Sequence, residues 1–135
     1  MEFLLIFGGL FALCIIFIMT IVTIKKRQAK RFLEEHPSAV MVYNEELPNE
    51  SISFIVPKIF KNKYCHANEG ILLLPGATYN LGLWHEHRYN NTTTTTRNMV
   101  SFVPAIGKTY VAKFDKITKV FSIEECEPEY KERYL

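Results

Sequence analysis

The residues best suited to chemistry are two histidines separated by one position, His85 and His87. Alternate residues of a β-strand point to the same face, so both imidazoles could reach one metal ion if they lie on a strand. Cys65 and His66 could supply further ligands. Zinc sites use three or four ligands held by a second layer of contacts, and nothing in the sequence brings these two pairs together. We therefore expect no metal and no cofactor, and we keep a small metal-binding enzyme or sensor using His85 and His87 as an alternative.

Motifs for nucleophilic catalysis are also missing from the sequence. Neither Cys65 nor Cys126 lies in a recognisable catalytic pattern, and no GxSxG or phosphate-binding loop occurs. The segment 107–109 reads Gly-Lys-Thr like the end of such a loop, but Phe102 stands where its first glycine is required. We predict that the protein is not an enzyme.

An uncharged, apolar run from Phe3 to Ile24 is the strongest signal in the chain. As a helix it would be roughly 33 Å long, which matches a hydrocarbon core of about 30 Å. A cleaved signal peptide would carry its positive charge before the run, whereas here the cations follow it. We expect an uncleaved transmembrane anchor over residues 1–24 and a basic juxtamembrane segment over residues 25–36.

Five cations follow the apolar run within seven positions: Lys25, Lys26, Arg27, Lys30 and Arg31. Cytoplasmic flanks of membrane spans are enriched in Lys and Arg, so the N-terminus is predicted outside and the following domain in the cytoplasm. The cluster should lie at the membrane surface and attract anionic lipid headgroups without specificity. Specific binding of one acidic lipid is the alternative. The lipid bilayer is thus the first expected partner.

Charge and cysteine usage narrow the remaining function classes. Residues 32–123 carry nine Lys and Arg against eight Asp and Glu, and the tail 124–135 is acidic. No basic face is evident, so we expect no nucleic-acid partner. Only Cys65 and Cys126 lie beyond the anchor, which fits a reducing compartment. An extracytoplasmic envelope module with a Cys65–Cys126 disulfide is the alternative.

Residues 37–123 show the pattern of an all-β domain. Short runs of β-branched and aromatic residues alternate with turn signals such as Pro75-Gly76, where glycine suits the positive φ of a type II turn. We expect a small antiparallel β-sandwich preceded by one N-terminal transmembrane α-helix. The predicted strands cover residues 39–43, 51–56, 71–74, 79–89, 98–103, 108–114 and 117–123, with a possible edge strand over 58–64. Residues 90–96 are predicted to form an extended, exposed polar hairpin tip, into which the two strands can continue partway because Thr favours β-strands.

The segment 71–114 resembles a recurring bacterial β module. Residues 73–81 read Leu-Leu-Pro-Gly-Ala-Thr-Tyr-Asn-Leu, and residues 107–110 read Gly-Lys-Thr-Tyr. Similar strand starts occur in PEGA-type and related small domains of unknown function. The resemblance implies a compact β-sandwich for binding or spacing, with no catalytic residues. Domains of that kind often face outward, whereas the Lys and Arg pattern favours the cytoplasm.

Taken together, these patterns predict a single-pass, membrane-anchored, non-catalytic protein that interacts with an unknown protein partner or acts as a scaffold. An exposed hairpin is a natural contact element. We therefore expect Trp84, Tyr89 and Met99, on the long predicted hairpin, to bind the partner.

Overall fold

A computed structural model describes residues 2–127 of the chain, with side chains from residue 6 onward. It begins with one uninterrupted helix, α1 (Glu2–Glu35). The predicted anchor and the predicted juxtamembrane segment are therefore parts of the same helix. The last helical hydrogen bond runs from His36 N to Phe32 O at 2.8 Å, and Pro37 follows, whose ring disfavours a helical residue before it.

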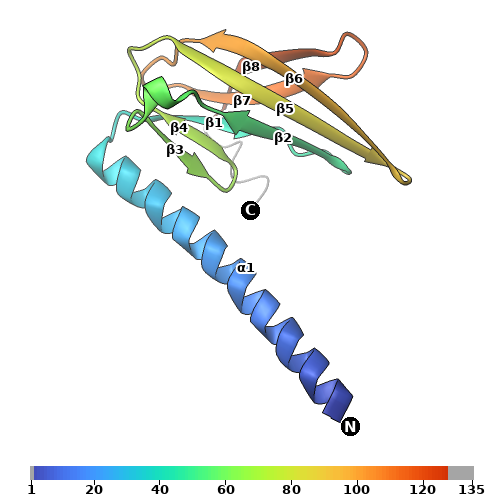
Figure 1. Ribbon diagram of the computed structural model, residues 1–135. Helices are drawn as coiled ribbons and strands as arrows, with labels where there is room; N and C mark the ends of the chain where they lie inside the picture. The colour runs from blue at the N-terminus through green and yellow to red at the C-terminus, as the bar shows by residue number, and fades with distance from the viewer. Residues whose placement is uncertain (1, 128–135) are drawn as a thin grey trace.

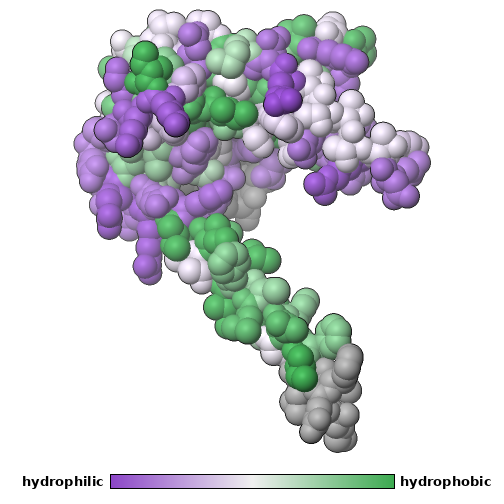
Figure 2. Space-filling model, in the orientation of Figure 1, coloured by the Kyte–Doolittle hydropathy of each residue, from purple (hydrophilic) through white to green (hydrophobic). Residues whose placement is uncertain are grey.

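The part of α1 from Ile6 onward is long and apolar enough to cross a bilayer. Its apolar side chains are exposed rather than packed against the rest of the protein. Figure 2 shows this helix as an apolar rod that projects from a polar junction with the remainder of the molecule.

Eight strands in the described residues form two sheets (Figure 1). One sheet has the order β3-β4-β1-β7-β8 and the other the order β2-β5-β6. The strands are β1 (Val40–Asn44), β2 (Glu50–Ile55), β3 (Tyr64–Ala67), β4 (Gly70–Leu73), β5 (Tyr79–Tyr89), β6 (Thr92–Phe102), β7 (Thr109–Asp115) and β8 (Val120–Cys126).

The expectation of β-sheets behind an apolar N-terminal helix is confirmed, with two corrections. The chain is not all-β, because α1 accounts for 34 residues. The pairing is not wholly antiparallel either, because β1 and β7 run parallel, with Val42 opposite Tyr110. Two parallel neighbours cannot be joined by a tight hairpin; here most of the other strands lie between them in the sequence.

Both sheets contribute side chains to one hydrophobic core. Because alternate residues of a strand face the same way, each strand offers every second residue to the interior. The buried cluster consists of Val40, Val42, Ile52, Ile71, Leu73, Tyr79, Leu81, Leu83, Tyr110, Ala112 and Phe121. The Tyr79 hydroxyl satisfies its hydrogen-bonding needs inside this core by donating to the Leu74 carbonyl at 2.7 Å.

Two glycines serve the turns and contacts that the strands require. Gly76 has φ +86°, as predicted for the Pro75-Gly76 turn. Gly70, at the start of β4, lies so close to β1 that a Cβ there would overlap the Val42 carbonyl oxygen. The β1–β4 pairing therefore depends on a residue without a side chain at position 70.

The long hairpin differs from the prediction at its tip. The turn is only Asn90-Asn91, with Asn90 at φ +54°, and β6 already starts at Thr92. The strands therefore extend through nearly all of residues 90–96, further than the partial continuation that was predicted. Thr is β-branched and favours strands, and the ladder with β5 continues through the threonine run, with Thr93 opposite Arg88.

The strand boundaries near residues 58–64 and 117–126 also differ from the predicted ones. Residues Lys58–Phe60 form a 3₁₀ turn before β3, rather than an edge strand. Residues 116–119 form the β7–β8 turn, in which Ile117 is 94% exposed. Strand β8 therefore starts at Val120 and runs to Cys126, past the predicted boundary at residue 123. Residues 128–135 of the expected acidic tail lie outside the described residues.

The helix lies against one edge of the five-stranded sheet. Only residues 36–39 separate α1 from β1, which is the central strand of that sheet. The last third of α1 lies beside β3, the edge strand (Figure 1). In the β3–β4 turn, Asn68 Nδ2 donates to the Val22 carbonyl oxygen at 3.3 Å. The domain therefore contacts α1 close to the end of its uncharged run.

Candidate functional site

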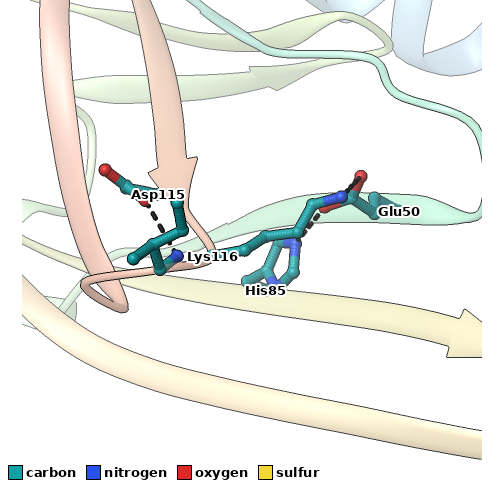
Figure 3. A network of polar contacts seen from close by, with 5 residues as sticks. Glu50, His85, Asp115 and Lys116 are labelled. Carbon is teal, nitrogen blue, oxygen red and sulfur yellow. Dashed lines mark hydrogen bonds and ion pairs between the residues drawn. The ribbon is translucent and has the colours of Figure 1, made fainter.

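His85 lies in a buried polar network that closes one end of the core (Figure 3). Its Nε2 atom is 2.9 Å from Glu50 Oε1, and the other carboxylate oxygen of Glu50 is 2.9 Å from Lys116 Nζ. His85 is only 3% exposed, whereas about half of the Lys116 side chain reaches solvent. We refer to these three residues as the clasp.

The register of β2 on β5 brings the first two members together. Glu50 and Ile52 both face the core, and Ile52 is directly opposite His85. Lys116 arrives from the β7–β8 turn. Within that turn, Asp115 Oδ1 accepts a hydrogen bond from the Ile117 backbone N–H at 2.9 Å, which fixes the loop that carries Lys116 (Figure 3).

An aromatic stack supports the imidazole from the opposite sheet. The rings of His85 and Phe114 are 4.0 Å apart at their centroids and 26° from parallel. Phe114 in turn packs against Phe121, with 4.7 Å between the centroids of the two rings. Together, the clasp and this aromatic stack join β2 and β5 of one sheet to β7 and β8 of the other.

Glu50 is the charged centre of the clasp. Burial alone would raise its pKa, but hydrogen bonds from Lys116 and His85, together with their charges, hold the pKa below its usual value of 4.5. An ionised carboxylate only accepts hydrogen bonds, so His85 Nε2 carries the hydrogen that it donates to Glu50. A carboxylate beside an imidazole can act in acid–base catalysis, yet here both groups face the core.

The other residues considered for metal binding are dispersed. His87 lies two residues beyond His85 and stacks on Tyr89, with ring centroids 6.5 Å apart. Cys65 and His66 belong to β3, in the other sheet. Among residues 2–127, no three or more His, Cys, Asp or Glu side chains are grouped so that they could hold a metal ion.

The alternative with a Cys65–Cys126 disulfide does not fit this fold. Both cysteines are free, and they lie in β3 and β8, the two opposite edges of the five-stranded sheet. Four inter-strand spacings separate those edges, or roughly 19 Å, whereas a disulfide needs Cα atoms within about 7 Å. Burial raises the pKa of both thiols, which keeps them in the less reactive protonated form.

The outer face of the three-stranded sheet exposes an apolar patch. The register aligns Ile55 of β2, Gly82 of β5 and Met99 of β6 in one row. A Cβ at Gly82 would be 3.2 Å from Ile55 Cβ and 3.5 Å from Met99 Sδ, so these two side chains flank the glycine. Ile55 is 53% and Met99 57% exposed.

Trp84 forms the neighbouring row of this face. The Arg97 guanidinium lies 4.5 Å from the centre of its ring, a cation–π contact. The indole N–H donates to Glu86 Oε1 at 3.1 Å, so the ring is fixed from two sides. We call Ile55, Trp84, Arg97 and Met99 the outer-face patch.

Two of the three predicted partner-binding residues therefore belong together. Trp84 and Met99 share the outer-face patch, whereas Tyr89 points to the other side of β5 and lies next to the hairpin turn. Ile55 and Arg97 were missed because nothing in the sequence gives the register that places them beside Trp84. Glu50 and Lys116 were missed for the same reason.

The predicted membrane-surface residues all lie on the exposed last third of α1. They divide between two sides of the helix. Lys25 and Arg31 border a cavity shared with β3, and Lys26, Arg27 and Lys30 border another beside the β3–β4 turn. Figure 2 shows polar side chains gathered at this junction, above the apolar part of the helix.

Comparisons with known proteins found no family model, no curated protein and no solved structure that matches this chain. The resemblance of residues 71–114 to PEGA-type domains therefore stays a prediction.

We predict that Glu50→Gln lowers the free energy of unfolding by about 1–3 kcal/mol at neutral pH, because the amide leaves Lys116 without its counter-charge. The folded-state pKa of Glu50 is depressed, so its contribution is complete above pH 4.5 and is lost as the pH falls through that lower value. The variant and the wild type should therefore converge in acid. Urea unfolding followed by Trp84 fluorescence, from neutral pH to about pH 3, measures both curves.

The matched control is Glu46→Gln, which removes the same charge from an exposed loop position. We expect it to change the free energy of unfolding by less than about 0.5 kcal/mol. A Glu50→Gln protein as stable as the control at neutral pH would show that the clasp does not stabilise the fold.

Proposed function

We propose that this chain is a single-pass membrane protein whose β-sandwich domain binds another protein at the membrane surface without catalysing a reaction. The length and apolar character of α1 support the membrane anchor. The single core shared by two sheets supports the sandwich architecture. The outer-face patch is the observation that carries the interaction role.

The outer-face patch has the features of a binding surface rather than of a solvated sheet face. Solvent-exposed strand faces are ordinarily polar, yet Ile55 and Met99 are each more than half exposed here. Trp, Met and Arg are enriched in the centres of protein interfaces. Trp84 is already held by Arg97 and Glu86, so less conformational entropy is lost when a partner binds.

The partner best suited to this surface presents apolar side chains to Ile55 and Met99 and an acidic group to Arg97. Arg97 has no carboxylate within ion-pair distance among residues 2–127. An acidic group on the partner would add an ion pair at the rim of the contact.

A binding role is also favoured over a catalytic one by the state of the clasp. Its imidazole is buried between Glu50 and Phe114, so a substrate would have to displace core side chains to reach it. We infer that the clasp stabilises the fold and that the groups available to a partner are those of the outer-face patch.

For topology we propose the N-terminus outside and the β domain in the cytoplasm. The Lys and Arg residues after the span favour this direction. The three cysteines, none of which is paired, suit a reducing compartment.

We predict that a photo-crosslinking amino acid at position 99 captures a protein partner in intact cells, and that Ile55→Glu or Trp84→Ala abolishes capture. The added charge or the lost ring removes the apolar centre of the contact. Capture should fall at least ten-fold, since losing a central anchor costs about 2 kcal/mol or more. The measurement is the yield of the crosslinked band.

The control is Ile117→Glu, which places the same charge at an exposed apolar residue in the β7–β8 turn. Capture should be unchanged in that variant. Equal loss with Ile117→Glu and Ile55→Glu, or full capture despite Trp84→Ala, would contradict the assignment of this face.

We predict that a cysteine at position 117, in a chain whose own three cysteines are replaced, is not labelled by a membrane-impermeant maleimide in intact cells. It should be labelled fully once the membrane is opened, because Ile117 is almost completely exposed. Labelling of intact cells would place the domain outside and reverse the proposed topology.

A further inference from the structure

An open cavity of about 760 Å³ lies between the last third of α1 and the edge strand β3, together with the loop that precedes β3. On the helix side it is bordered by Lys25 and Arg31, which lie six residues apart and so fall within about 120° of each other around the helix axis. On the domain side it is bordered by Lys61, in the loop between the 3₁₀ turn and β3. Two distant parts of the chain thus bring three cations to one cavity.

The three cavity cations are free to neutralise an external anion, because none of them has a carboxylate partner among the described residues. Lys108, Lys113 and Lys116 each form an ion pair, with Glu125, Glu124 and Glu50 respectively. Within residues 2–127, Lys25, Arg31 and Lys61 form none.

The cavity lining as a whole is positive. Among the described residues that line it, Glu35 is the only acidic one, so three cations minus one anion leave this part of the lining with a formal charge of +2 when the histidines are neutral. Burial, helped by the charge of Lys25, lowers the pKa of His66, which favours its neutral form at pH 7. Together with Gln28 and Asn62, also in the lining, His66 adds uncharged hydrogen-bonding groups to the cations.

The cavity is also placed at the depth of lipid headgroups. Lys25 is the first charged residue after the apolar run, so the bilayer surface must lie near it. The contact between Asn68 and the Val22 carbonyl brings the sheet down to the same level of the helix. A phosphate in this cavity would have its acyl chains beside the apolar surface of α1.

We propose that this cavity binds the phosphate-bearing headgroup of an anionic phospholipid. The proposal rests on the membrane anchoring argued above and adds a defined site to it. A collar of cations on the helix alone would attract anionic lipids without preference for position. Lys61 distinguishes the two cases, because it belongs to the domain and takes part only if the headgroup lies between helix and sheet.

The test is native mass spectrometry of the full chain in detergent, titrated with a short-chain phosphatidylglycerol or the matching phosphatidylcholine. The wild type should bind phosphatidylglycerol in preference. Lys61→Gln and Arg31→Gln should each weaken that binding on the order of five-fold, since each cation near the surface contributes about that factor. Binding of phosphatidylcholine should not change.

Two variants control for charge alone. Lys58→Gln removes an exposed cation of the domain three residues before Lys61, and Lys30→Gln removes a cation from the other side of the helix. Neither residue lines this cavity, and we expect less than a two-fold effect from each. A separate titration with inorganic phosphate tests for a free anion, which should compete only weakly.

Several results would overturn the proposal. Equal effects of Lys58→Gln and Lys61→Gln would show that the lipid is attracted by general charge and not by this cavity. Equal binding of phosphatidylglycerol and phosphatidylcholine would show that the cavity does not select an anionic headgroup. Strong competition by inorganic phosphate would make it a site for a soluble anion. Extraction of the wild-type chain from membranes by alkaline carbonate would contradict the membrane anchoring on which the lipid site rests. Partner capture at position 99 does not involve Lys61, so it tests the proposed function independently of the lipid site.

Discussion

The arrangement of this protein depends on the short connection between its helix and its central strand. Four residues join Glu35 to Val40, and a fully extended segment of that length spans at most about 14 Å. The β domain therefore stays next to the end of α1. Packing of β3 on the helix and the contact of Asn68 with Val22 then select one orientation. The cationic cavity exists only because of that orientation.

The domain itself is held together at the end of its core by the clasp. Strand β2 carries Glu50 inward at its start and Ile55 outward at its end. The same strand thus contributes one residue to the clasp and one to the outer-face patch. Fixing Glu50 against His85 and Lys116 fixes the register that places Ile55 beside Met99. Stability and the proposed binding surface are in this way two consequences of one strand alignment.

Local patterns in the sequence predicted the elements well where local physics decides them. The uncharged run predicted the helix, and Pro75-Gly76 predicted a turn that Gly76 makes at φ +86°. The threonine run was predicted as a hairpin tip that the strands enter only partway, whereas pairing with β5 keeps all five threonines in a strand. The clasp and the outer-face patch depend on which residues face each other across strands. A single sequence does not specify that register, so Glu50, Lys116, Ile55 and Arg97 were not foreseen.

The most direct test of the helix–domain arrangement is crosslinking across it in native membranes. With Cys14, Cys65 and Cys126 replaced, a pair of cysteines at positions 22 and 68 should be joined efficiently by a short bismaleimide. A pair at 24 and 68 should not, because residues 22 and 24 lie about 200° apart around the helix. Equal crosslinking of the two pairs, or none in either, would show that the β domain is not docked on α1.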